Sequence, residues 1–484
     1  MRPYLALLVF FLAKTSLAQK YVLSNKPQLN QKKSFYHAPI GENQYGIFTL
    51  NYANDYLSDG FSIEQYDREL GFVSDRMIDL PRRTYVLRVF LVDSNIYWVT
   101  AERKRKENLR LNISSLKANL QGEIQSKFLC SLPLREWAPD DINFALEIEG
   151  SHWAVSTLKG MQKGTLHWLK IFDLNGRELS SVQDTVKEQI SDLALTDLTL
   201  ADSIHCAGIL KIQRPKRLFQ TRSKDEEVYL FRCLSQNSLN YEIWDSEKTI
   251  QTTDLTFDRM RNEWCAVSLV GPTRRETTGY QCVRASLNNE QIENVSMEFT
   301  DMQARILDGQ MKAKKRRNPR NYVLRRVIPT QGRGMVALLE RYVELKQLET
   351  FYINGIPQTA TKVLYNYNEI GAIFLNKDGL IDTVLRINKE QTAAPGTSYL
   401  LGYGSFVCEN GIHLVYNNDI SKNNEVLDVV IRPDYEIDKH TLVSSDNFYN
   451  VVVPFDGLET SYCSFTLPLV RDKQWLWMQV LNGD

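Results

Sequence analysis

The chain has 484 residues with 58 basic and 58 acidic side chains, so its formal net charge is zero. A zero net charge excludes a partner selected by overall charge, and any charged binding surface must arise from where the charges lie. Hydrophobic residues make up 43% of the chain, as in packed globular proteins, and no low-complexity or linker-like stretch divides it. A chain too long for one ordinary core and without linkers favours a repeat architecture, in which length adds units.

The first eighteen residues have the pattern of a secretory signal peptide. Arg2 gives a positive start, residues 4–13 form an apolar run, and Ser16-Leu17-Ala18 is a small-residue cleavage box before Gln19. The apolar run is too short to span a bilayer, and no later segment approaches the roughly 20 apolar residues of a membrane helix. We therefore expect residues 1–18 to be removed and the mature protein, without a transmembrane segment, to be exported to the periplasm, the cell envelope or the medium.

The rest of the chain consists of short apolar or alternating runs separated by turn residues. The stretch from Tyr322 to Asn388 shows this most clearly, with four apolar runs and breaks at 331–333 and 376–379. Four such runs in a row predict a four-stranded antiparallel sheet. The unit recurs at irregular spacings, mostly longer than the roughly 40–50 residues of WD40 and kelch repeats. We predict a single all-β domain over 45–484, a β-propeller, with the first strand of each blade innermost.

The strand groups predict seven four-stranded blades, with eight as the alternative. The first group, residues 45–80, lacks a strand, and we expect strands from the N- and C-terminal ends to complete it and to remove exposed sheet edges. Residues 19–44 are predicted to be a polar lead-in, and residues 301–311 a short helix. The connection between the second and third strands of the sixth blade, Val343 to Asn368, is predicted to be a long loop that is either mobile or in contact with a partner.

Two segments carry a resemblance to a known group. Residues 331–342 (QGRGMVALLERY) and 365–391 (YNYNEIGAIFLNKDGLIDTVLRINKEQ) resemble uncharacterised exported β-propeller proteins of Gram-negative bacteria. The resemblance covers about one blade and implies the fold and export. It implies no activity and no functional residues, because one fold hosts many functions.

The cysteines and histidines point to no metal or cofactor. The seven cysteines have no C-x-x-C spacing, and the six histidines are dispersed, so each is interpreted as structural or superficial. Cys206 with Cys233, and Cys265 with Cys282, fall on neighbouring predicted strands. Disulfides within blades are one interpretation of these pairs, and buried free thiols are the other.

No catalytic residue can be assigned from the sequence. Motifs of serine hydrolases, P-loop proteins, zinc proteases and calcium loops are absent. Glycosidases use two carboxylates, and four aspartates lie in or beside predicted first strands, but nothing selects two of them: Asp192, Asp197, Asp254 and Asp258. Aspartate is also a common turn residue. Five tryptophans in predicted strands are interpreted as packing between blades: Trp98, Trp153, Trp168, Trp264 and Trp475.

Basic residues collect on one predicted side of the propeller. In a four-stranded meander, the second-to-third connections and the crossovers between sheets emerge at one end, and the remaining turns at the other. The second-to-third connections and the crossovers carry these candidate binding residues: Arg82, Arg83, Arg103, Lys104, Arg105, Lys106, Arg214, Lys216, Arg217, Arg274, Arg275, Lys314, Lys315, Arg316 and Arg317. Clustered cations attract anions, although loops also carry charge simply because they are solvated.

The predicted function is therefore a non-enzymatic binding or scaffold protein of the cell envelope. Its basic face would bind an anionic glycan or an acidic protein surface. One alternative is a carbohydrate-active enzyme, a glycoside hydrolase or lyase, with carboxylates at the mouth of the propeller channel. A purely structural envelope component is another. No nucleic-acid-binding motif is found.

Overall fold

The computed structural model describes most of the chain. The described residues are 20–23, 35–41, 44–54, 57–67, 70–81, 84–92, 95–102, 109–117, 119–132, 142–147, 151–161, 164–187, 193–213, 226–235, 238–244, 248–287, 292–310, 318–330, 334–353, 356–420, 425–444, 450–461, 463–471 and 474–481. The predicted signal peptide lies outside them. They form eight antiparallel sheets, and the chain divides into two compact units. We call residues 52–60 and 79–390 the five-sheet unit, and residues 1–51, 61–78 and 391–484 the three-sheet unit.

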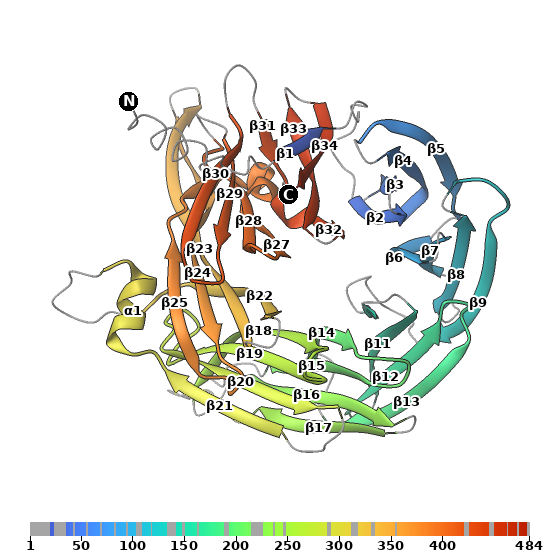
Figure 1. The fold of residues 1–484 in the computed structure, drawn as a ribbon, viewed down its shortest axis with the longest axis horizontal. Helices are drawn as coiled ribbons and strands as arrows, with labels where there is room; N and C mark the ends of the chain where they lie inside the picture. Colours follow the sequence, from blue (N-terminus) through green and yellow to red (C-terminus); the bar gives the residue numbers. More distant parts are fainter. Residues whose placement is uncertain are drawn as a thin grey trace, which may run out of the picture. The chain divides into compact units, whose positions relative to one another are not determined.

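The five-sheet unit contains five consecutive meanders (Figure 1). The first two are β6 (Thr84–Val92), β7 (Asn95–Glu102), β8 (Leu109–Lys117), β9 (Gln125–Leu132), and β10 (Ile142–Leu146), β11 (His152–Met161), β12 (Gly164–Asp173), β13 (Glu178–Val186). The next two are β14 (Leu193–Leu200), β15 (Cys206–Gln213), β16 (Glu226–Ser235), β17 (Ser238–Trp244), and β18 (Thr249–Asp258), β19 (Glu263–Gly271), β20 (Gly279–Ser286), β21 (Ile292–Glu298). The last is β22 (Tyr322–Thr330), β23 (Gly334–Ile353), β24 (Ile356–Leu375), β25 (Ile381–Ile387).

The three-sheet unit holds the remaining strands, except for their residues within 52–60 and residue 79, which belong to the five-sheet unit. Two of its sheets are meanders, β2 (Phe35–Gly41), β3 (Gln44–Asn54), β4 (Leu57–Asp67), β5 (Phe72–Asp79), and β27 (Gly404–Cys408), β28 (Gly411–Asn417), β29 (Val426–Ile431), β30 (Ile437–Val443). Its third sheet has the order β1 (Lys20–Leu23), β34 (Gln474–Leu481), β33 (Ser464–Arg471), β31 (Asn450–Val452), with β32 (Leu458–Ser461) also paired to β33. The unit also holds β26 (Gln391–Ala393) and the 3₁₀ turns Pro395–Leu400 and Pro454–Asp456.

The succession of four-stranded meanders confirms the predicted β-propeller class. The described residues form eight sheets, the alternative count, and not seven. The difference arises at the ends of the chain, because β2 supplies the strand that the first group was thought to lack. The terminal strands form a separate sheet, in which β1 pairs antiparallel with β34. Both β1 and β2 lie within residues 19–44, where the sequence predicts a polar lead-in, because strands of four and seven residues are too short to carry a clear periodic signal.

Local turn chemistry explains why these residues form these elements. Between β12 and β13, the Asp173 carboxylate accepts a hydrogen bond from the Arg177 amide at 2.8 Å, and Gly176 adopts φ 67°. This is the turn that the Asp-Leu-Asn-Gly sequence predicts, because only glycine enters the left-handed region without strain. The predicted helix is α1 (Asp301–Asp308), which begins with a capping box between Thr300 and Gln303 and ends at Gly309.

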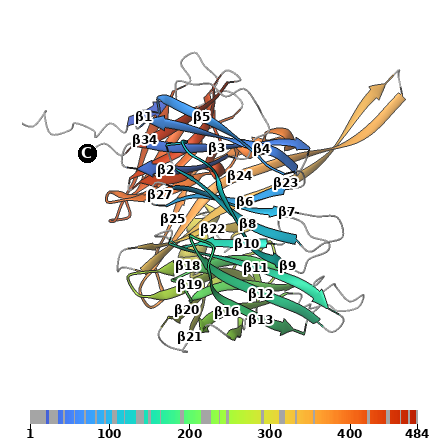
Figure 2. The ribbon, with the colours of Figure 1, turned by 90° about the vertical axis from the view of Figure 1, so that its right-hand side faces the viewer.

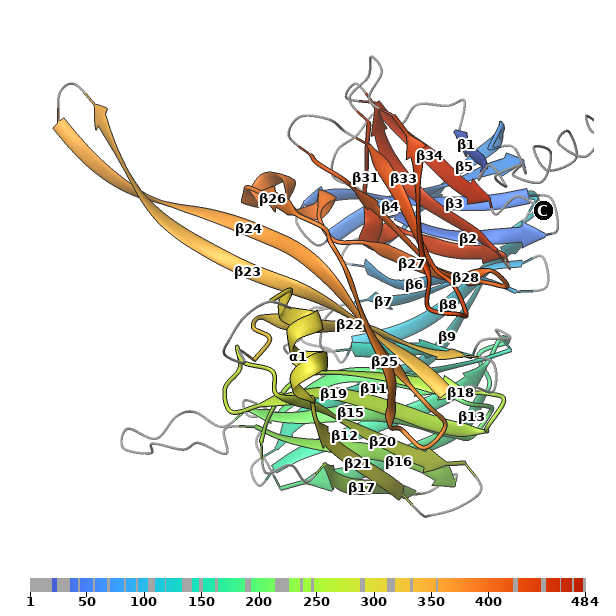
Figure 3. The ribbon, with the colours of Figure 1, turned by 60° about the vertical axis from the view of Figure 1, so that its left-hand side comes forward.

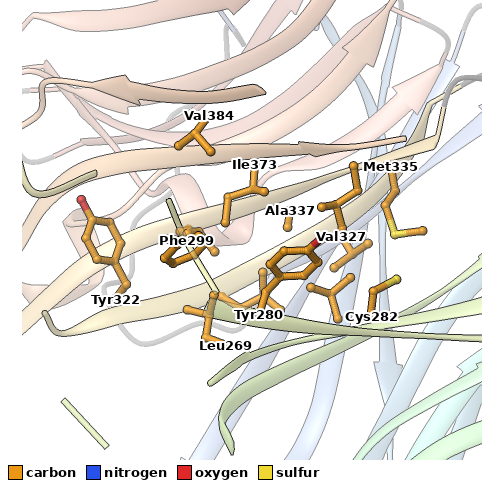
Figure 4. Close-up of a cluster of buried hydrophobic side chains, with 14 of the residues drawn as sticks. Leu269, Tyr280, Cys282, Phe299, Tyr322, Val327, Met335, Ala337, Ile373 and Val384 are labelled. Atoms are coloured by element: carbon orange, nitrogen blue, oxygen red, sulfur yellow. The ribbon is translucent and has the colours of Figure 1, made fainter. Parts of the chain in front are cut away.

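Aromatic and aliphatic side chains fill the spaces between neighbouring sheets of the five-sheet unit. Trp153 is fully buried, with ring centroids 5.4 Å from Phe144 and 4.5 Å from Phe172. Another cluster joins the β18–β21 sheet, the β22–β25 sheet and α1, and Figure 4 shows Tyr280, Phe299 and Ile373 within it. The five tryptophans predicted to pack are all buried. Each sheet therefore buries its faces against its neighbours, as repeat architectures require.

The segment predicted as a long loop, Val343 to Asn368, is instead regular structure. β23 and β24 are each twenty residues long and pair continuously from Tyr342↔Tyr367 to Ile353↔Ile356. We call residues 343–353 and 356–367 the arm, because the hairpin extends well beyond β22 and β25 (Figures 2 and 3). The loop prediction is wrong because the segment alternates in polarity and its Asn354-Gly355 dipeptide is a strong hairpin signal.

A buried charge network lies at the base of the arm. Glu340 on β23 is fully buried and accepts hydrogen bonds from Arg325 at 2.8 Å and from Lys389 at 2.5 Å. Desolvation lowers the pKa of Lys389, and the Glu340 charge opposes that shift. Lys389 and Arg325 also lie 5.9 and 5.2 Å from the Tyr367 ring centroid on β24. The network therefore links three strands and the segment after β25 where the arm begins.

Within the described residues, no helix has the length and apolar character needed to cross a bilayer.

The substitution Glu340→Ala is expected to lower the free energy of unfolding by about 3–5 kcal/mol, because it leaves the fully buried Lys389 and the partly buried Arg325 without their carboxylate. Urea titration of each variant measures the change. Glu349→Ala breaks the exposed Glu349–Lys362 pair on the arm and should change stability by less than about 1 kcal/mol. Equal effects of the two substitutions would contradict the assigned role of Glu340.

Candidate functional site

The structure describes two of the predicted basic-face residues, Arg274 and Arg275, and both side chains are exposed. They lie in the connection between β19 and β20, as the strand assignment predicts. The other predicted residues lie outside the described residues: Arg82, Arg83, Arg103, Lys104, Arg105, Lys106, Arg214, Lys216, Arg217, Lys314, Lys315, Arg316 and Arg317. The β19–β20 connection is therefore the part of the predicted basic face that the structure describes.

The loop that carries Arg274 and Arg275 is joined to the crossover that enters β22. The Asn321 amide donates to the Arg275 carbonyl at 2.7 Å, and the Thr277 amide donates to the Pro319 carbonyl at 2.8 Å. Glu276 and Arg320 form an isolated antiparallel bridge. A second-to-third connection and a crossover therefore do meet at the same end of adjacent sheets here. This contact also brings Arg320, which is 68% exposed, next to the loop.

The side chain of Gln251 on β18 holds the β19–β20 loop through three hydrogen bonds. Its side-chain nitrogen donates to the carbonyls of Thr273 at 2.7 Å and Glu276 at 2.8 Å, and its oxygen accepts from the Thr277 hydroxyl at 2.7 Å. The Thr273 hydroxyl accepts from two following amides, those of Arg275 and Glu276. A Cβ at Gly271 would lie 1.7 Å from the Glu276 carbonyl, so glycine is required for this close approach. The loop is thus held by several directed hydrogen bonds.

We call Arg274, Arg275 and Arg320 the basic loop cluster. One carboxylate, Glu276, lies among them, with its Oε2 3.9 Å from an Arg320 nitrogen and its Oε1 accepting from Asn318 at 2.6 Å. Three cations and one anion leave the cluster net positive. Guanidinium groups match carboxylate and sulfate geometry through paired N–H donors, so the cluster can bind an anionic group. Sequence reasoning could not find Gln251, because a single strand glutamine carries no motif.

Two of the four candidate aspartates come together on neighbouring first strands. Asp197 on β14 accepts hydrogen bonds from the amides of Leu198 and Leu255, each at 2.9 Å. Asp254 on β18 accepts from the Val327 amide on β22. Burial raises the pKa of Asp197 to about 6. Burial, with the Asp197 charge second, raises the pKa of Asp254 to about 7.

These contacts give the two aspartates a structural role. Each carboxylate accepts an amide hydrogen from the next first strand, so each joins two sheets edge to edge. A glycosidase pair instead needs one carboxyl group that donates a proton to the substrate and another that attacks or activates water. Asp258 caps a turn through the Met260 and Arg261 amides, as expected of a turn aspartate. Asp192 lies outside the described residues.

The described histidines and cysteines have ordinary structural partners. His167 is buried between the Ser156 hydroxyl at 2.8 Å and the Tyr241 hydroxyl at 2.9 Å, and burial lowers its pKa to about 3. Cys206 faces Cys233 directly in the β15–β16 register, whereas Cys265 and Cys282 are offset, with Cys265 opposite Arg284. Cys206, Cys265 and Cys282 are buried and are not in disulfides. No cluster of three metal-binding side chains occurs in the part of the chain that is described.

Comparisons with known proteins show that the chain resembles solved structures in its fold. No protein-family model and no curated protein matches the sequence. The chain is similar to the β-propeller domain of the Trilobed protease from Pyrococcus furiosus, at 10% identity over 88% of this chain and 99% of that one, with a TM-score of 0.37. It is also similar to prolyl oligopeptidase B from Galerina marginata, at 8% identity over 93% of this chain and 55% of that one, with a TM-score of 0.39. These values transfer no activity or site to this chain.

The raised pKa values of Asp197 and Asp254 predict a stability that falls as pH rises. Between about pH 4 and pH 7 the folded carboxyl groups hold protons that the unfolded chain releases, so the free energy of unfolding decreases through this window. A shift of one pKa unit corresponds to about 1.4 kcal/mol, so we expect a total loss of several kcal/mol. Urea unfolding midpoints measured from pH 4 to pH 8 test this.

The substitution Asp254→Asn should weaken the dependence of the unfolding midpoint on pH. The control Asp378→Asn, in an exposed turn, should leave that dependence unchanged. An unchanged pH dependence for Asp254→Asn would refute the role assigned to Asp254.

Proposed function

We propose that the protein is a non-enzymatic binding or scaffold protein that presents a basic loop surface to an anionic glycan or an acidic protein surface. The observation that supports this best is the contact between the β19–β20 loop and the crossover at 318–321. It places Arg274, Arg275 and Arg320 at one end of two adjacent sheets. A preorganised loop binds with less loss of conformational entropy than a free one. The signal-peptide pattern of residues 1–18 supports a site of action at the cell envelope.

The charge balance of the cluster favours binding by attraction over catalysis. The acid nearest the cluster, Glu276, already pairs with Asn318 and Arg320, so it is not poised as an acid or base. The two aspartates with raised pKa values accept backbone hydrogen bonds between sheets. The carbohydrate-active enzyme therefore remains the less supported alternative. A glycan bound at the basic loop cluster would be held through its sulfate or carboxylate groups.

Charge reversal at the loop tests the proposal. The double substitution Arg274→Glu and Arg275→Glu should lower the salt concentration at which the protein elutes from heparin, because it replaces two exposed cations with anions. A matched control is Arg177→Glu with Arg259→Glu, which makes the same charge change at exposed turns at the opposite ends of sheets. Elution on a polyglutamate column distinguishes an acidic protein surface from a glycan.

The comparison between the two double variants decides the outcome. If both elute at the same salt concentration, retention depends on overall charge and the proposed surface is wrong. If the wild-type protein is not retained on either column at low salt, the proposal also fails.

A further inference from the structure

The arm has one strand edge that nothing in its own sheet covers. β22 pairs with β23 only as far as Tyr322↔Arg341, and the sheet order is β22-β23-β24-β25. Within the described residues of this sheet, the outer edge of β23 therefore has no paired strand from Glu344 to Tyr352. An isolated two-stranded hairpin is marginally stable in water, whereas three or more strands are stable. An uncovered edge also offers a row of backbone donors and acceptors to another strand.

Pro357 identifies which backbone groups face outward. Pro357 pairs with Tyr352, and proline has no amide hydrogen, so this pair does not exchange backbone hydrogen bonds. Because such pairs alternate, the residues of β23 with outward backbone groups are Glu344, Lys346, Leu348, Thr350 and Tyr352. The same proline removes one outward donor from the β24 edge. The β23 edge has no proline over these nine residues, so it is the edge that can accept a partner.

The exposed side chains of this edge are unusually apolar. Leu348 is 76% exposed, Tyr352 71%, Phe351 42% and Leu345 38%. The three charged residues of β23 in the arm form ion pairs with neighbours: Lys346 lies 3.2 Å from Glu344, and Glu349 lies 2.8 Å from Lys362 on β24. The edge therefore combines open backbone groups, apolar side chains and internally neutralised charge, which together favour strand addition over solvation.

The residue order about Leu348 fits a second copy of the same strand. When two copies of β23 pair antiparallel with Leu348 opposite Leu348, the residues with outward backbone groups face one another along the whole edge. Leu345 then faces Phe351 of the other copy, Gln347 faces Glu349, and Lys346 faces Thr350. Apolar residues thus meet apolar residues three times, because Leu345 faces Phe351 twice and Leu348 faces Leu348 once. An amide meets a carboxylate twice, and no like charges face each other, so the register is compatible with a two-fold interface.

We propose that the protein forms a two-fold homodimer through its arms, in which the β23 edges of two copies pair antiparallel about Leu348. The two hairpins then form one four-stranded sheet. A sheet needs three or more strands to be stable in water, so the four-stranded sheet of the dimer meets a requirement that a single hairpin does not. The interface is separate from the basic loop cluster and does not depend on it.

Substitutions on the two edges of the arm test the dimer by light scattering after size exclusion, with the full chain at micromolar concentration. The wild type should be dimeric. Leu348→Lys places two like charges opposite each other, and Thr350→Pro removes an outward amide of β23, so each should raise the dissociation constant at least tenfold. Thr359→Pro is the matched control. Thr359 pairs with Thr350 and lies on the other edge, so this variant should remain dimeric.

A position-specific cross-link tests the register. With a short bismaleimide, Leu348→Cys should give a covalent dimer, and Thr361→Cys should not, because Thr361 pairs with Leu348 on the far edge. The wild type treated in the same way controls for native thiols. A monomeric wild type overturns the proposal. So does a dimer that survives both Leu348→Lys and Thr350→Pro, since it must form elsewhere. Loss of heparin retention would leave this dimer unaffected, so the two proposals fail independently.

Discussion

The alignment of three consecutive sheets in the five-sheet unit, those that begin with β14, β18 and β22, depends on hydrogen bonds at the outer edges of their first strands. In a four-stranded meander the first strand pairs on one side only, so half of its backbone amides point away from its own sheet. Side chains of the neighbouring first strand accept these hydrogens. Asp197 bonds the Leu255 amide, Thr252 bonds the Leu324 amide at 2.9 Å, and Asp254 bonds the Val327 amide. Hydrophobic packing holds the sheet faces together, and these bonds determine how the sheet edges align.

This arrangement also explains the strained registers of the first strands. The pairing shifts between Leu195 and Asp197 in β14, between Ile250 and Thr253 in β18, and between Leu324 and Arg326 in β22. A bulge adds a residue to one strand and bends it. The bulges lie beside the side chains that form the inter-sheet bonds, so the same irregularity that disturbs one ladder connects two sheets. The carboxylates of Asp197 and Asp254 therefore lie near each other because both form inter-sheet bonds, which is a structural reason and not a catalytic one.

The sequence was sufficient for the elements with strong local signals. The turn at Asp173 to Gly176, the capped helix α1 and the buried strand tryptophans all follow from residue type and spacing. Features that depend on distant partners were not predictable. β1 is only four residues long and is defined by its pairing with β34, about 450 residues later. The proximity of Asp197 to Asp254, and the hydrogen bonds of Gln251 to the β19–β20 loop, likewise depend on residues far apart in the sequence. The extent of the arm could have been predicted from its alternation and its Asn-Gly turn.

The pairing of β1 with β34 has a consequence for biosynthesis. Translation runs from the N-terminus, so Lys20–Leu23 are made about 450 residues before Gln474–Leu481, and the sheet they share cannot be completed until the later strand is made. The long sequence separation of these contacts makes their formation entropically slow. The other sheets consist of consecutive strands and can form while synthesis continues. β1 therefore stays without its partner strand while the sheets between β1 and β34 are being synthesised.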